Sequence, residues 1–393
     1  MNDSLYIAWK YISFYRIITA TLVACITLIL FLPVALELLL RESERQLMSR
    51  AKSTPFLVGA KGSALDLVMN SLYFGNHIPE LITMEASLRI ADSEMAKPIP
   101  IYARFRARGY PIIGTTLDYF EFRGLELSLG RNMAILGECI LGATVAEKLN
   151  LTPQSALVSS PENVFDLAGI YPLKMKVTGI LKRSHTSDDL AIFVDLKTAW
   201  AIEGLLHGHE DLSEAADPQV ILKKEKGNIV GSPKVFQYME ISEKNLESFH
   251  LHAITAELPI TSVIAIPRDD KSGTILQGRY LANNESSQIV SPQEVIDGLL
   301  QSIFRMKNVL DAVILVVTFG MVLTIILVFA LSLRLRQNEV TTIFRLGCQR
   351  MTIARLLSAE IAIIVAMSLL SCTTLLFILD RYSNDLVRGL FIR

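Results

Sequence analysis

Several features that define common protein classes are scarce or missing in this sequence. The chain has four cysteines in 393 residues. Cys139 is the only cysteine in the long region between the first two apolar runs, so this region has no disulfide framework. No phosphate-binding loop of the form Gly-x-x-x-x-Gly-Lys-Ser/Thr occurs, and the segment from Gly59 to Gly62 lacks its spacing. Nucleophile-elbow, His-Glu-x-x-His and cysteine-pair metal motifs are missing too. Any ATP-dependent function would therefore need an ATPase on another chain.

The composition combines a high apolar content with an ordinary share of charge. Hydrophobic residues make up 51% and charged residues 20%, and the mean hydropathy is +0.40. This combination is typical of a few membrane spans attached to a sizeable water-soluble domain. The formal net charge of −1 gives no overall signal for nucleic-acid binding.

Three apolar runs are long enough to cross a bilayer, which takes about 20 residues. They occupy residues 17–40, 309–333 and 356–379. The first run is too long for the hydrophobic region of a signal peptide, and no small-x-small cleavage site follows it before Arg41. We therefore expect an uncleaved anchor and three spans.

The loop at 334–355, between the second and third runs, carries the strongest orientation signal. It holds five arginines against one acid, Glu339. Because the loop is short, the positive-inside rule places it in the cytoplasm. Lys10 and Arg16 likewise place residues 1–16 there. Residues 41–308 and the tail at 380–393 are then expected outside the cytoplasm.

The large outer segment, 41–291, has a mixed pattern that predicts an α+β domain. β-branched residues and alternation predict strands at 99–105, 175–181, 190–194 and 262–266. Helical periodicity predicts helices at 142–149, 196–206 and 244–251. Clusters of Gly, Pro, Asn and Ser predict loops at 150–161 and 226–233.

A long helix is predicted to follow this domain. Ser291, Pro292 and Glu294 form a capping box with proline at the first helical position. Apolar residues then recur at helical spacing into the second span, with no breaker. A helix over 292–333 would be roughly 60 Å long, and its part at 292–308 would form a stalk outside the membrane. The first span should also extend outward, as far as Arg50, because no Gly or Pro lies between 37 and 50.

The segment after the second apolar run holds, in this order, Arg336, Glu339, Val340, Ile343, Arg345, Leu346, Gly347 and Ile353. This order resembles the coupling segment of the MacB, LolC/LolE and FtsX family of ABC transporter permeases, whose usual form is R-x-x-E-I-x-x-x-R-x-x-G-x-x-x-x-x-I. Arg345 falls one position later than in the family pattern. Glu360 stands near the start of the next span, where the family often has Glu. Segments 114–120, 130–131, 141–146 and 177–181 also follow the order of the family's outer domain.

The resemblance implies that this segment docks on a cytoplasmic ATPase subunit. A short amphipathic helix would offer Val340, Ile343, Phe344 and Leu346 to a groove, with arginines making charge-assisted contacts, and Gly347 would end it. The family implies a non-catalytic subunit of the bacterial inner membrane, with a periplasmic domain of MacB type and with ATP and Mg bound by the partner. A second permease copy, in a homodimer or heterodimer, and a lipoprotein, adaptor or hydrolase are the further partners expected.

The family has four spans and this sequence shows three. We expect a three-span variant, a truncation, or a helix supplied by a partner.

Two His-x-His pairs suggest an alternative function. His207 and His209 are followed by Glu210 and Asp211, and a second pair is formed by His250 and His252. Imidazole and carboxylate groups suit zinc, so the four histidines are candidate ligands of a membrane-anchored zinc-binding protein or metalloenzyme. Ordinary polar histidines at a surface or interface would produce the same pattern.

Overall fold

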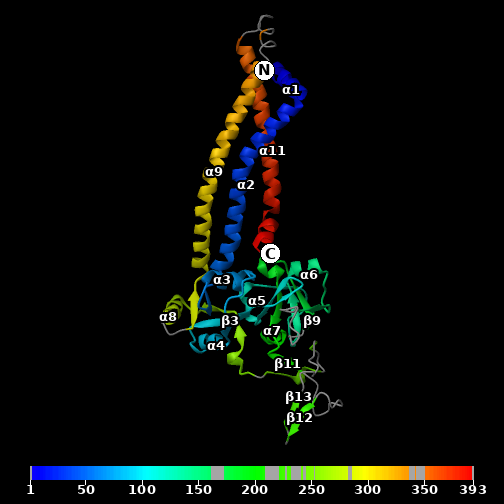
Figure 1. Ribbon diagram of the computed structural model, residues 1–393, viewed down its shortest axis with the longest axis vertical. Helices are drawn as coiled ribbons and strands as arrows, with labels where there is room; N and C mark the ends of the chain where they lie inside the picture. Colours follow the sequence, from blue (N-terminus) through cyan, green and yellow to red (C-terminus); the bar gives the residue numbers. More distant parts are fainter. Residues whose placement is uncertain are drawn as a thin grey trace. The chain divides into compact units, whose positions relative to one another are not determined.

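The computed structural model describes residues 2–160, 172–208, 221–225, 228–231, 240–241, 245–251, 253–281, 286–335, 341 and 350–391. The chain divides into two compact units (Figure 1). A helical unit comprises Met1–Gln46 and Leu299–Phe391, and an α+β unit comprises Leu47–Gly298.

The helical unit is built from α1 (Asn2–Phe14), α2 (Arg16–Lys52), α9 (Pro292–Leu335) and α11 (Arg350–Phe391). α1 packs against α11. Ile12, Leu22 and Ile364 form a small buried core shared by α1, α2 and α11. Pro33 lies inside α2, which continues past it.

Two described helices are long and apolar enough to cross a membrane, 16–52 and 354–383. They correspond to the first and third predicted spans. The second predicted span is helical as well, but its apolar stretch within the described residues, Asp311–Leu327, is shorter. The structure therefore bears out two of the three expected spans by length and composition.

The α+β unit is organised around one mixed sheet. Its strand order is β17 (Ser287–Val290), β1 (Phe56–Ala60), β16 (Ser262–Pro267), β3 (Ala96–Tyr102), β5 (Tyr110–Thr115), β10 (Ile192–Asp195), β7 (Glu138–Leu141), β9 (Lys174–Leu181) and β6 (Leu127–Gly130). β4 (Arg106–Ala107) pairs with β5, and β8 (Ala156–Val158) pairs with β9. β10 runs parallel to β5 and β7 parallel to β9, whereas the remaining pairs are antiparallel.

Helices and small hairpins complete this unit. The helices are α3 (Ala64–Tyr73), α4 (Glu85–Asp92), α5 (Asp118–Arg123), α6 (Ala143–Leu149), α7 (Leu196–Ile202) and α8 (Asp270–Tyr280), with 3₁₀ turns η1 (Ser187–Leu190), η3 (Leu246–Ser248) and η4 (Thr255–Glu257). Short antiparallel pairs join β2 (Ile82–Thr83) to β15 (Pro259–Ile260), β11 (Leu206–Gly208) to β14 (Phe249–Leu251) and β12 (Ile221–Glu225) to β13 (Asn228–Gly231). Side chains such as Tyr102, Phe193 and Ile112 are fully buried in the core.

Most of the predicted elements are confirmed, with shifted ends. The four predicted strands correspond to β3, β9, β10 and β16, and the helix at 142–149 is α6. α7 ends at Ile202 rather than Leu206, which begins β11. α9 covers the whole helix predicted at 292–333, and α2 extends past Arg50 as expected.

Three predictions are wrong in whole or in part. Residues 244–251 were expected to be helical, but Leu246–Ser248 forms η3 and Phe249–Leu251 forms β14, because the latter pairs with β11. The predicted loops at 150–161 and 226–233 contain β8 and β13. In each case pairing with a distant or neighbouring strand overrides the local pattern, which is helical at 244–251 and rich in turn residues at the two loops.

Candidate functional site

The residues predicted to couple to an ATPase lie outside the described residues. They are Arg336, Glu339, Val340, Ile343, Phe344, Arg345, Leu346 and Gly347. The helices on either side are described: α9 runs to Leu335 and α11 begins at Arg350. The coupling role of the segment therefore stays a prediction made from its sequence.

The predicted metal ligands are brought together in part. In the β11–β14 pair, the backbone of His207 is directly opposite that of His250. His250 Nδ1 is 2.9 Å from the carbonyl oxygen of Ser248. His209, His252, Glu210 and Asp211 lie outside the described residues. Over the described ranges, no three His, Cys, Asp or Glu side chains gather closely enough to hold a metal ion.

A largely buried cluster of charged and polar groups surrounds the end of α2. We call it the α2 anchor, and it comprises Arg50, Tyr73, Tyr119, Asp188 and the half-buried Arg123. Arg50 lies in the last turn of α2 and is 6% exposed. Its Nη1 donates to Asp188 Oδ2 at 2.6 Å and its Nη2 to Asp188 Oδ1 at 2.9 Å. The ion pair is therefore bidentate, the strongest geometry for an arginine and a carboxylate.

Tyr119 of α5 bonds both members of this ion pair. Its hydroxyl donates to Asp188 Oδ1 at 2.7 Å and accepts from Arg50 Nη2, also at 2.7 Å. The Thr186 hydroxyl donates to Asp188 Oδ2 at 2.9 Å. Asp188 thus accepts from three side chains, which compensates for removing its charge from water.

The remaining members of the α2 anchor attach the helix to its surroundings. The Tyr73 hydroxyl of α3 donates to the carbonyl oxygen of Leu47 in α2. Arg123, at the end of α5, donates from Nη2 to Thr54 Oγ1 at 2.9 Å and from Nη1 to Ser53 Oγ at 3.0 Å. The last turn of α2 and the residues after it are therefore held by groups from α3, α5 and η1.

Burial and pairing act in opposite directions on the anchor's charges. Burial by itself would raise the pKa of Asp188, but Arg50 and the hydrogen bonds from Arg50 and Tyr119 give a net lowering. Burial by itself would lower the pKa of Arg50, but Asp188 and Tyr119 give a net increase. Burial raises the pKa of Tyr73 to about 12. The pair therefore stays ionised at neutral pH.

Gly142 is needed for the loop that presents Asp188. A Cβ at this position would lie 2.2 Å from the Asp188 carbonyl oxygen and 2.5 Å from the Asp189 carbonyl carbon. Real Cβ atoms do not approach backbone so closely, so a larger residue would push η1 away from α6. The sequence pattern predicted Gly142 at a helix start but gave no sign of this role.

No protein-family model matches the sequence, and no curated protein matches it. Among solved structures, the chain is similar to the periplasmic region of MacB from Actinobacillus actinomycetemcomitans: 13% identity over 65% of this chain and 97% of that one, with a TM-score of 0.34. It is also similar to the extracellular domain of the noncanonic ABC-type transporter YknZ from Gram-positive bacteria: 12% identity, 60% and 98% coverage, and a TM-score of 0.32.

Proposed function

We propose that this chain is the membrane subunit of an ABC-type complex, in which an ATPase on a separate chain drives movement of the α+β unit. The chain itself would carry no catalytic site. The observation that carries the proposal is the continuity of α2. One helix includes both an apolar stretch long enough to cross a membrane and, at its end, the buried Arg50.

The α2 anchor supports the proposal because it would resist separation of the end of α2 from η1. Pulling the end of α2 away from η1 would leave both Arg50 and Asp188 buried without their partner, which costs several kcal/mol. Repacking a few apolar side chains would cost much less. A displacement of the helix end is therefore expected to move Asp188, η1 and the adjoining sheet with it.

The sequence supports the cytoplasmic end of this mechanism. The segment 336–350 lies between two long helices, and its arginines favour a cytoplasmic position. Its apolar residues would fill a groove on the ATPase. Residues 1–16 would also be cytoplasmic, and the α+β unit would face the periplasm of a bacterial inner membrane. Two permease copies would pair with two ATPase copies, which bind ATP and Mg.

The decisive experiment replaces Arg336–Arg350 by a Gly/Ser segment of equal length in the full chain expressed with its ATPase. We expect loss of co-purification, because the segment supplies both the apolar and the cationic contacts. Arg381→Ala with Arg388→Ala is the matched control, because these arginines lie in the tail that should be outside. If the ATPase stays bound to the Gly/Ser variant, the proposal fails.

Zinc binding is a second proposal, favoured by the register that places His207 opposite His250. It is tested by metal analysis of the purified full chain, with His207→Ala plus His250→Ala compared with the His77→Ala control. Stoichiometric zinc that is lost in the double variant and kept in the control would support a site. Wild-type protein that takes up no zinc from a buffered zinc solution would exclude one.

A further inference from the structure

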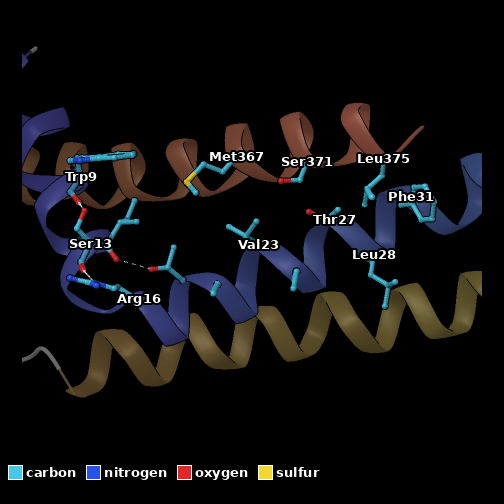
Figure 2. Close-up of a pocket in the computed structure, with 14 residues that line it drawn as sticks. Trp9, Ser13, Arg16, Val23, Thr27, Leu28, Phe31, Met367, Ser371 and Leu375 are labelled. Atoms are coloured by element: carbon cyan, nitrogen blue, oxygen red, sulfur yellow. Dashed lines mark hydrogen bonds between the residues drawn. The ribbon is translucent and has the colours of Figure 1, made fainter. Parts of the chain in front are cut away.

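A long groove runs along the helical unit between α2 and α11, with α1 at one end (Figure 2). Its volume is about 820 Å³. The groove is hollow because Ala20 and Ala24 lie one turn apart on α2, where small side chains leave space. Val23, Phe31 and Leu375 are among the apolar residues that line it.

Arg16 lies at the α1 end of this groove, where Trp9 also lines it, with Ser13 between the two (Figure 2). Its Nε donates to the carbonyl oxygen of Ser13 at 3.1 Å, which fixes the direction of the guanidinium. Within the part of the chain that the structure describes, Arg16 makes no salt bridge. Its Nη1 and Nη2 form an edge suited to two oxygens of a phosphate.

The length and the ends of the groove match one phospholipid. Arg16 and Phe31 are 15 residues apart on α2, roughly 22 Å along the helix axis, and one leaflet with its headgroup region is roughly 20–22 Å thick. An acyl chain could lie in the apolar part while its headgroup stays at the level of Arg16. Trp9 is a residue that favours the membrane–water interface, which places this end at headgroup depth.

We propose that this groove binds one anionic phospholipid of the cytoplasmic leaflet, with the phosphate on Arg16 and an acyl chain along Ala20 and Ala24. The site rests on the proposed orientation of α2, with its start in the cytoplasm, but not on any association with an ATPase. An arginine beside an apolar groove at the cytoplasmic face attracts anionic lipid, and its charge adds to the contact made by the chain.

The test is native mass spectrometry of the full-length protein, purified and incubated with phosphatidylglycerol or with phosphatidylcholine of the same acyl chains. We expect one phosphatidylglycerol to be retained, and Arg16→Gln to weaken its binding roughly fivefold, the loss expected for one cation near the headgroup. Lys10→Gln is the matched control: it removes an equal charge from α1 at a residue that does not line the groove.

A second pair of variants tests the acyl-chain part. Ala24→Phe would fill the groove and should abolish retention of phosphatidylglycerol, whereas Ala366→Phe, on an exposed position of α11 outside the groove, should not. Circular dichroism would check that all variants keep their helices. The proposal is overturned if phosphatidylcholine is retained as well as phosphatidylglycerol, or if Arg16→Gln behaves like Lys10→Gln. It is also overturned if Ala24→Phe turns a dimer into a monomer, because a second copy would then occupy the groove.

Discussion

Arg50 differs from the other arginines of α2 in what surrounds it. The side chains of Arg41 and Arg45 are 75% and 72% exposed and pair with acids of the same helix, whereas the Arg50 side chain is 5% exposed and pairs with Asp188, 138 residues away. Exposed ion pairs within one helix contribute little, because water screens them. The buried pair is costly to break, because either partner alone would be a charge without compensation.

Arg50→Met should therefore lower the stability of the α+β unit by about 3–5 kcal/mol. Urea unfolding of the full chain in detergent would measure this, followed by fluorescence of Trp200, which is buried in that unit. A Trp9→Phe background removes the only other tryptophan.

Two further variants serve as a control for Arg50→Met and as a test of the buried charge. Lys182→Ala removes the exposed pair with Glu126 and should leave the unfolding midpoint unchanged. Adding Asp188→Leu to Arg50→Met should recover part of the loss, because the orphaned carboxylate is gone. Equal midpoints for wild type and Arg50→Met would contradict a structural role for the pair.

Asp188 should also make stability depend on pH. Its pKa is lowered in the folded protein from an ordinary value near 3.8. The unfolded chain therefore takes up the proton first, so the stabilisation is complete above that ordinary value and is lost as pH falls through the folded pKa. Between pH 5 and pH 3, urea midpoints should fall more steeply for wild type than for Asp188→Asn. Parallel curves would contradict this.

The sequence could not single out this residue. Arg41, Arg45 and Arg50 look alike in a run of charged helical residues, and no local signal tells which of them meets η1. Burial of Arg50 depends on a segment far along the chain and on Gly142, which lets η1 approach α6. Local patterns carry helix and strand tendencies but not such long-range pairing.

At the scale of elements, the long helices were the most predictable part. The capping box at Ser291 and the unbroken apolar spacing indicated α9, and the backbone N–H of Val295 bonds the Ser291 carbonyl oxygen at 3.2 Å, as the first helical hydrogen bond should. β14 was missed because a strand of three residues has no periodicity of its own. Its conformation is set by the β11 backbone, more than 40 residues earlier.

The packing of α2 against α9 gives a prediction at this scale. Lys307 of α9 donates to Glu37 of α2. In a chain whose native cysteines are replaced by serine, a short bis-maleimide should join Glu37→Cys to Lys307→Cys. After proteolysis of the α+β unit, the fragment that contains α2 and the fragment that contains α9 should then stay together on a denaturing gel. Glu37→Cys with Arg305→Cys is the control, because two residues along a helix turn the side chain by roughly 200°. Equal crosslinking of both pairs would contradict the packing.

At the scale of the whole molecule, the α+β unit is an insertion between two helices of the helical unit. β1 follows α2 and β17 precedes α9, and these two strands pair, with Leu57 opposite Val290. The sequence indicated the α+β class but not this strand order, because β1 and β17 are separated by more than 220 residues. The α+β fold class can be predicted from local patterns. The strand order depends on pairing between distant segments, which local patterns do not predict.

This arrangement predicts that the inserted unit can be removed. Paired residues of antiparallel strands have Cα atoms roughly 4.5–5.5 Å apart, so a short Gly/Ser linker can replace residues 56–290. The shortened chain should insert into membranes and, under the proposed function, still co-purify with the ATPase. The measurement is membrane fractionation followed by affinity purification, with the Gly/Ser variant of 336–350 as the negative control. Loss of the ATPase from the shortened chain would show that the inserted unit takes part in docking.

The β1–β17 pair also determines which loads the α+β unit can bear. The residues nearest the two helices, Leu57 and Val290, face each other at one end of the ladder. Forces that drew α2 and α9 apart would first have to break the α2 anchor, and would then open this ladder one hydrogen bond at a time from that end. Forces that moved both helices in the same direction would leave every bond of the ladder intact. Under the proposed function, the α+β unit would tolerate movement of both helices together better than movement that separates them.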